Sequence, residues 1–230
     1  MKNTFTALMI ILFASLSQAQ DQDFSSDWKK VEAFEKEGLP KSALKVVEEI
    51  EANAKKYDVP ALKIKVLLFK SKYALTLEED AQLKIIDDFR SEIKKNEFPT
   101  KNMLESVLAN LFWQYFQQNR WQFYNRTKTE SKVDPNDFRT WDLQTLFDEI
   151  HLHYQVSLEN GLLAQRTELG LFDDILHTQE DSKIFRPTLF DFLNHKALAF
   201  YKTPENQITK PAYKFEISDE KLLSDAMVFS

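Results

Sequence analysis

Two histidines separated by one residue, His151 and His153, are the most suggestive candidate metal ligands in the sequence. The segment around them has helical periodicity, and on a helix residues i and i+2 point about 200° apart, so this pair is not expected to chelate one ion. The other two histidines, His177 and His195, are isolated, and no third ligand is indicated. The sequence therefore predicts no metal site and no bound cofactor.

Adjacent carboxylates, as at Asp87 and Asp88 or Asp173 and Asp174, are candidates for acid–base chemistry. They lie at predicted helix starts or on polar faces, where acidic side chains are favoured. The carboxylate pairs of glycosidases come from separate elements of a fold. The chain has no cysteine and only three glycines, so thiol nucleophiles, cysteine–zinc sites and glycine-rich phosphate loops are excluded, and no Gly-x-Ser-x-Gly motif is present. We therefore expect no catalytic residues and no enzyme activity.

The stretch Leu111–Tyr124, LFWQYFQQNRWQFY, contains seven aromatic side chains. Exposed along a groove, such rings would bind a sugar, a peptide or a nucleic acid. On a helix, however, most faces of this segment are apolar, which predicts the buried centre of a helical domain. The rings expected to be buried are Phe112, Tyr115 and Phe116. The helix is predicted to end or bend at Asn119.

Two arginines flank the last aromatic residues of this stretch, so its C-terminal end is a candidate binding surface. The candidate partner face consists of Arg120, Trp121, Tyr124 and Arg126. The partner is expected to be a protein. Nucleic acid is disfavoured because the formal net charge is −6 and the charges alternate in sign along the chain rather than forming a basic block.

The N-terminus has the three parts of a secretory signal peptide. Lys2 supplies the positive charge, a short apolar stretch follows, and Ser17-Gln18-Ala19 offers small residues for cleavage after Ala19. The apolar stretch is too short to span a bilayer, and no second long apolar run follows it. We therefore expect an exported protein of the periplasm or cell envelope that has no membrane span.

The rest of the chain is predicted to be all-α, a stack of antiparallel helical hairpins that resembles a degenerate tetratricopeptide-type solenoid. From about residue 24 to 120 the apolar residues recur at spacings of three and four, which predicts a succession of five helices with short connections. Gly38 is expected to end the first helix, Ser25 or Ser26 to cap it, and Thr76 to Glu79 to form a capping box.

The second half is predicted to contain one long helix from about 136 to 160, a short one around 167 to 177, and another that begins at Pro187. The predicted organisation is therefore a signal peptide at 1–19, an α-hairpin stack at 20–120, a second helical subdomain at 121–201 packed on the first, and a linker with a terminal helix at 202–230. Because the chain stops one residue after an apolar run, we expect it to be the front piece of something longer.

Three stretches together suggest a family. They are GLPKSALKVVEEI (38–50), WQYFQQNRWQFYNRT (113–127) followed by TWDLQTLF (140–147), and RPTLFDFLNHKALAF (186–200). They resemble the N-terminal helical region of large secreted bacterial proteins of the α2-macroglobulin-like family, over about residues 27 to 230. In that family the region precedes a series of β-sandwich domains, and the complete protein traps or inhibits peptidases at the cell envelope.

The resemblance implies a non-catalytic scaffold or docking region, with a peptidase as the target of the complete protein. The family's β-sandwich domains and its Cys-Gly-Glu-Gln thioester motif are absent from this sequence, so no functional residue is carried over. The alternative is a free-standing secreted α-hairpin adaptor that binds a peptide or a protein. A secreted hydrolase is disfavoured by the missing motifs.

Overall fold

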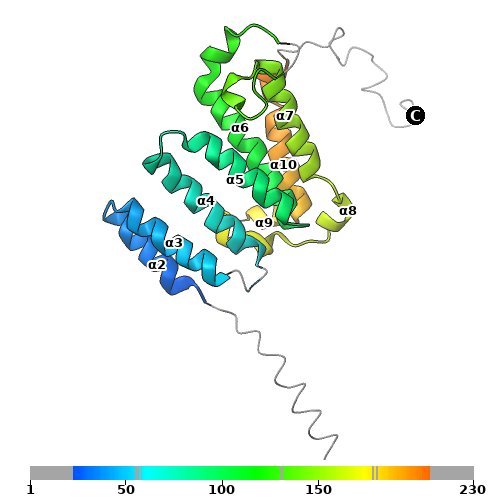
Figure 1. Cartoon of the computed structure of the whole chain (residues 1–230). Helices are drawn as coiled ribbons and strands as arrows, with labels where there is room; N and C mark the ends of the chain where they lie inside the picture. The colour runs from blue at the N-terminus through cyan, green and yellow to red at the C-terminus, as the bar shows by residue number, and fades with distance from the viewer. Residues whose placement is uncertain are drawn as a thin grey trace, which may run out of the picture. The chain divides into compact units, whose positions relative to one another are not determined.

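The computed structural model describes residues 23–54, 57, 59–129, 132–177, 179 and 181–207. The predicted signal peptide and the terminal helix expected after Ser218 lie outside these residues. The described part of the chain is helical and holds one isolated antiparallel bridge, between Glu168 and Thr188, which confirms the all-α prediction (Figure 1). None of its helices is long and apolar enough to cross a membrane.

The chain divides into two compact units between Asp58 and Val59. The first is a hairpin of α2 (Ser25–Lys36) and α3 (Pro40–Ala54), which bury apolar side chains against each other. Gly38 follows the end of α2, as predicted, and has a φ of +71°. Glycine suits this position because a left-handed backbone is strained for residues that carry a Cβ. The prediction that Ser25 or Ser26 caps this helix was wrong. The N-cap residue is Phe24, whose side chain makes no capping hydrogen bond. Ser25 instead donates both its amide and its hydroxyl to the Asp23 carboxylate.

The second unit begins with three successive helices, α4 (Pro60–Leu77), α5 (Ala81–Lys95) and α6 (Thr100–Tyr124). With α2 and α3 they make the five helices expected between about residues 24 and 120, although α6 continues to Tyr124. The capping box predicted at Thr76 was wrong. Thr76 lies inside α4, where its hydroxyl donates to the carbonyl of Lys72 at 3.4 Å, and α5 begins only at Ala81.

The long helix predicted for 136–160 is divided into several elements. A 3₁₀ helix, η1 (Phe138–Thr140), precedes α7 (Leu143–Ser157), and α8 (Gly161–Ala164) follows. The Asp142 carboxylate accepts the backbone amide of Thr145 at 2.7 Å and thereby starts α7. Trp141, which precedes this cap, has extended backbone angles. Asn160, with a φ of 59°, separates α7 from α8.

The remaining elements are η2 (Leu169–Ile175), α9 (Ser182–Phe185), α10 (Leu189–Tyr201) and η3 (Pro204–Gln207). Helix α10 does not begin at Pro187 as predicted. Thr188 precedes it and forms a capping box with Asp191, in which each side chain accepts the other residue's amide. The segment predicted as a linker from residue 202 contains the short 3₁₀ helix η3 near its start.

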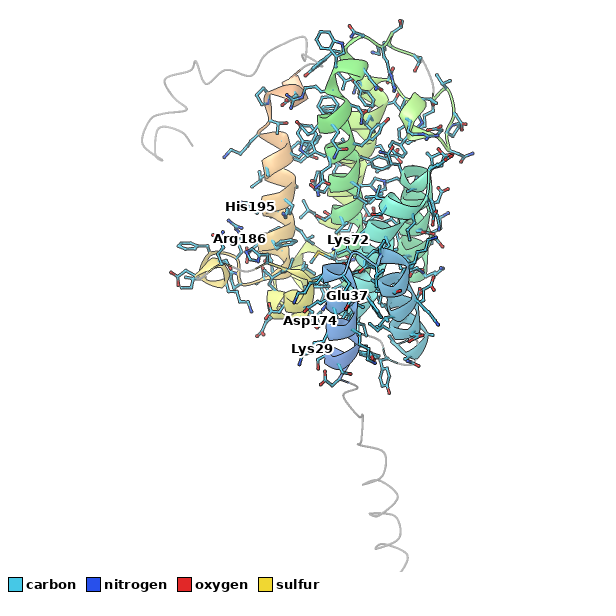
Figure 2. All side chains as sticks on the ribbon, turned by 90° about the vertical axis from the view of Figure 1, so that its left-hand side faces the viewer. Lys29, Glu37, Lys72, Asp174, Arg186 and His195 are labelled. Atoms are coloured by element: carbon cyan, nitrogen blue, oxygen red, sulfur yellow. The ribbon has the colours of Figure 1, made fainter. Side chains whose placement is uncertain are left out.

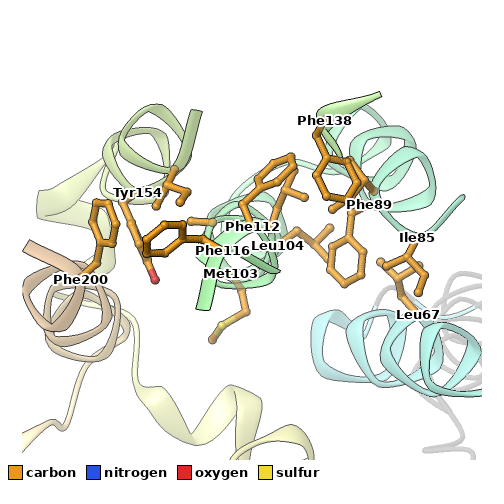
Figure 3. Close-up of a cluster of buried hydrophobic side chains, with 14 of the residues drawn as sticks. Leu67, Ile85, Phe89, Met103, Leu104, Phe112, Phe116, Phe138, Tyr154 and Phe200 are labelled. Atoms are coloured by element: carbon orange, nitrogen blue, oxygen red, sulfur yellow. The ribbon is translucent and has the colours of Figure 1, made fainter. Parts of the chain in front are cut away.

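Helix α6 lies at the centre of the second unit, with α5 and α7 packed against it and α10 beside α7 (Figures 1 and 3). Its side chains reach the core on several sides, as Figure 3 shows for Met103, Leu104, Phe112 and Phe116. Phe112 and Phe116 are fully buried as predicted, whereas Tyr115 is only partly buried. Because α6 continues through residue 120 and packs along α7, the helix itself crosses the subdomain boundary that the sequence suggested there.

Candidate functional site

The C-terminal end of α6 carries the four residues of the candidate partner face, and a bend sets their orientation. Asn119 has non-helical angles, φ −113° and ψ 17°, inside the helix. Its side-chain amide donates to the carbonyl of Tyr115 at 2.9 Å, which stabilises the bend that the sequence predicted. Beyond it, Phe123 is buried, whereas 79% of Trp121 and 47% of Tyr124 are exposed.

The two arginines of this face are engaged within the second unit. Arg120 forms an ion pair with Glu205 of η3 at 2.6 Å and a hydrogen bond with Gln117. Arg126 donates to the carbonyl of Trp141 at 2.6 Å, and its guanidinium carbon lies 4.6 Å from the centre of the Phe123 ring. The arginines therefore fix the end of α6 to its neighbours, and the aromatic side chains are the part that faces solvent.

Tyr124 connects the exposed and the buried aromatic residues. Its ring lies edge-to-face with Phe116 at a centroid distance of 6.2 Å, and Phe116 in turn contacts Phe123 at 5.8 Å. Trp121 makes no ring contact among the described residues, although it is the more exposed of the two. The exposed Trp121 thus lies three residues before Tyr124, whose ring packs on the buried Phe116.

A second group of polar residues lies inside the unit, where the sequence indicated none. His153 of α7 and Glu105 of α6 are joined by a contact of 2.5 Å between Nδ1 and Oε2, and both side chains are largely buried. On its other side, His153 Nε2 lies 3.6 Å from Glu149, too far for a hydrogen bond, so that attraction is electrostatic. The imidazole is therefore placed between two carboxylates.

Glu149 is held by two further cations. Arg90 of α5 contacts one of its carboxylate oxygens at 3.0 Å, and Lys132 contacts the other at 2.8 Å. The charged groups also pack on aromatic rings: the Lys132 ammonium lies 4.1 Å from the Trp141 ring centre, and the His153 ring stacks on Phe112 at 5.8 Å. This partly buried charge cluster joins α5, α6 and α7.

The cluster shifts the pKa values of Glu149 and His153. Burial alone would raise the pKa of the Glu149 carboxyl, but His153 and Lys132 outweigh it and lower the pKa to about 2. Burial alone would lower the pKa of His153, but the carboxylates of Glu105 and Glu149 outweigh it and raise the pKa above 6.5. The shifts therefore favour a protonated imidazole at His153 beside an ionised Glu149.

A protonated imidazole held in this way joins α7 to α6. Among the described residues, no serine or threonine hydroxyl hydrogen-bonds to His153, and no group of three or more acidic or histidine side chains is arranged to hold a metal ion. The helical spacing of Glu149 and His153, four residues apart, was the one signal in the sequence that could have indicated part of this cluster.

The other histidine of the pair has a separate neighbour. His151 lies on the exposed side of α7, where its Nδ1 is 2.5 Å from the hydroxyl of Tyr201 on α10. His151 and His153 thus point to different partners, as their spacing predicted.

Comparison of the chain with known protein families, with curated proteins and with solved structures found no match.

Proposed function

We propose that this chain is a non-catalytic helical docking region of an exported protein, which binds a protein partner through the end of α6. The observation that carries the proposal is the exposure of Trp121 and Tyr124 on a base fixed by Arg120, Arg126 and the buried Phe123. Tryptophan, tyrosine and arginine are enriched among the residues that dominate binding energy at protein interfaces.

Preorganisation of the residues around Trp121 and Tyr124 favours binding. The arginines already have partners within the unit, so the surface around Trp121 is ordered before any partner arrives, and little conformational entropy is lost on binding. A protruding tryptophan inserts into a pocket on its partner, while a half-buried tyrosine beside it contributes both apolar area and a hydroxyl.

The family resemblance supports a more specific version of the proposal. In this version the chain is the N-terminal scaffold of an α2-macroglobulin-like envelope protein, whose complete form traps or inhibits peptidases. The support comes from the three quoted sequence stretches. The alternative is a free-standing secreted adaptor, built from tetratricopeptide-like hairpins, that binds a separate peptide or protein.

A photo-reactive residue in place of Trp121 tests the docking face in the complete, natively expressed protein. We expect a discrete cross-linked product that is lost when Tyr124 is also changed to Ser. The matched control carries the photo-reactive residue in place of Leu75, an exposed residue of α4. Equal cross-linking from both positions, or none from position 121, would contradict the proposal.

The identity of the cross-linked segment separates the two versions. A cross-link to β-rich sequence encoded beyond Ser230 in the same reading frame supports the macroglobulin scaffold. A cross-link to a different polypeptide, together with a stop codon after Ser230, supports the adaptor.

A further inference from the structure

Helices α9 and α10 carry an exposed surface on which apolar and basic side chains are combined. We call it the basic apolar face and define it by these residues: Ile184, Phe185, Arg186, His195, Lys196, Leu198 and Lys202. Figure 2 shows Arg186 and His195 close together on the outer side of α10. None of these residues belongs to the candidate partner face on α6.

The apolar members of the basic apolar face protrude from the surface. Phe185 is 78% exposed and Ile184 is 72% exposed, both on the four-residue helix α9, and Leu198 on α10 is 54% exposed. Large apolar side chains with this degree of exposure do not line a groove. Adjacent apolar side chains exposed on a protein surface commonly mark a site of interaction with another protein or a membrane.

The charged members of the basic apolar face are cations, and Asp191, four residues before His195 on α10, is engaged in the capping box with Thr188. The electrostatic neighbours that lower the pKa of His195, after burial, are Arg186, Lys196 and Lys202, all of them cations. Among the described residues, none of these three cations forms an ion pair, in contrast to Lys183, which is bound to Asp173 at 2.5 Å. A local cationic surface has thus formed on a chain whose formal net charge is −6.

Helical spacing brings the two kinds of side chain together. His195, Leu198 and Lys202 are at positions i, i+3 and i+7 of α10 and its C-terminal cap, so they follow one stripe of the helix. Phe185 and Arg186 are adjacent in sequence at the end of α9. Apolar side chains are therefore interspersed with cations.

We propose that the basic apolar face binds the surface of an anionic lipid membrane. Cations attract the protein to anionic headgroups, and phenylalanine, isoleucine and leucine side chains enter the boundary between headgroups and acyl chains. A lipid surface accommodates protruding apolar side chains such as Phe185 and Ile184 without preformed pockets. Although the chain as a whole is anionic, this local group of cations would be attracted to an anionic surface and would orient the bound protein toward it.

Vesicle flotation with the full chain tests this proposal. We expect binding to phosphatidylcholine vesicles that contain phosphatidylglycerol, weak binding to pure phosphatidylcholine vesicles, and loss of binding as salt is raised. Lys196→Glu/Lys202→Glu is expected to weaken binding about tenfold or more, and Ile184→Ser/Phe185→Ser to reduce it similarly. The matched controls, Lys94→Glu/Lys128→Glu and Leu75→Ser, alter exposed residues elsewhere in the second unit and are expected to bind as the unchanged chain does.

Insertion of the apolar side chains can be observed directly, because the chain contains no cysteine. A Phe185→Cys variant labelled with an environment-sensitive fluorophore is expected to shift its emission to the blue on anionic vesicles, whereas a Leu75→Cys variant labelled in the same way is not. Circular dichroism of each variant establishes that it is folded.

Three results would overturn the proposal: no binding to anionic vesicles at low salt, equal losses in the test and control variants, or no blue shift at position 185. A soluble polyglutamate peptide distinguishes the competing class of partner. If it binds the chain in a manner sensitive to Lys196→Glu/Lys202→Glu while anionic vesicles do not bind, the face takes an acidic protein segment and the membrane proposal is wrong.

Discussion

His153 Nδ1 lies 2.5 Å from Glu105 Oε2, so two side chains separated by 48 residues in the sequence join α7 to α6 inside the second unit. The imidazole stacks on Phe112, and its other nitrogen faces Glu149. A polar contact at this depth is favourable only while its charges are matched. The stability of the unit is therefore expected to depend on the protonation of His153.

The first prediction concerns alkaline pH. The pKa of His153 is raised above 6.5 in the folded chain, because the carboxylates outweigh the opposing effect of burial. Its contribution to stability is therefore fully present below about pH 6.5 and is lost as the pH rises through the folded pKa. Urea denaturation at a series of pH values between about 6 and 9 should show a decreasing free energy of unfolding.

Substitution of the histidine separates this effect from other titrations. His153→Gln should remove most of the decrease between neutral and alkaline pH, whereas His177→Gln, at an exposed position, should retain it. A His153→Gln variant with the same pH dependence as the unchanged chain would show that the protonated imidazole contributes nothing.

The second prediction concerns Glu149, which contacts Arg90, Lys132 and His153. Glu149→Gln removes a carboxylate bound by several cations and should lower the free energy of unfolding at neutral pH by roughly 1.5–3 kcal/mol. Glu97→Gln, at an exposed position, serves as the control and should change little.

Acid pH provides a second check on Glu149. Its pKa is lowered from 4.5 to about 2, so its contribution is present above pH 4.5 and disappears as the pH falls toward 2. The stability difference between the unchanged chain and Glu149→Gln should therefore decrease in acid. A difference that stays constant from neutral pH down to about pH 2.5 would contradict the assigned role.

The sequence was sufficient to predict the helices of the first half and the burial of Phe112 and Phe116, because apolar periodicity reports directly on which helix faces are covered. It was insufficient at the helix ends. Thr76 and Glu79 have the spacing of a capping box, yet α4 continues to Leu77 because packing of its apolar face outweighs the local signal.

The candidate site was predictable only in part. The bend at Asn119 follows from the local sequence, but the anchoring of Arg120 by Glu205 depends on where η3 lies. The contact between Glu105 and His153 likewise depends on the packing of α6 against α7. Periodicity places a residue on one face of a helix, but it does not identify the side chain on the neighbouring helix.

The third prediction concerns the start of α7. The Asp142 carboxylate accepts the amide of Thr145 and also the amide of Thr129, each at 2.7 Å. Asp142→Ala removes both acceptors and should destabilise the chain by roughly 1–2 kcal/mol, while Asp142→Asn should cost less because an asparagine side chain still caps. Thermal unfolding of the two variants measures the difference. An equally small effect of both would show that α7 does not depend on this cap.

The fourth prediction contrasts two aromatic residues five positions apart on α6. Phe116 is fully buried and contacts the rings of Trp113, Phe123 and Phe147, whereas Trp121 is largely exposed. Phe116→Ala should therefore lower the free energy of unfolding by roughly 3–5 kcal/mol, because it removes buried area and leaves a cavity. Trp121→Ala should change it by less than about 0.5 kcal/mol, since few contacts are lost.

Urea denaturation of both variants, with fluorescence and circular dichroism as independent probes, measures these values. A stable Trp121→Ala variant that no longer forms the cross-links of the docking face would assign Trp121 to binding rather than to folding. If instead Phe116→Ala unfolds at the same urea concentration as the unchanged chain, the rings of α6 are not the core, and a solvated binding platform would explain this stretch better. If Trp121→Ala is as destabilising as Phe116→Ala, the tryptophan has a packing role, and the docking face loses its main support.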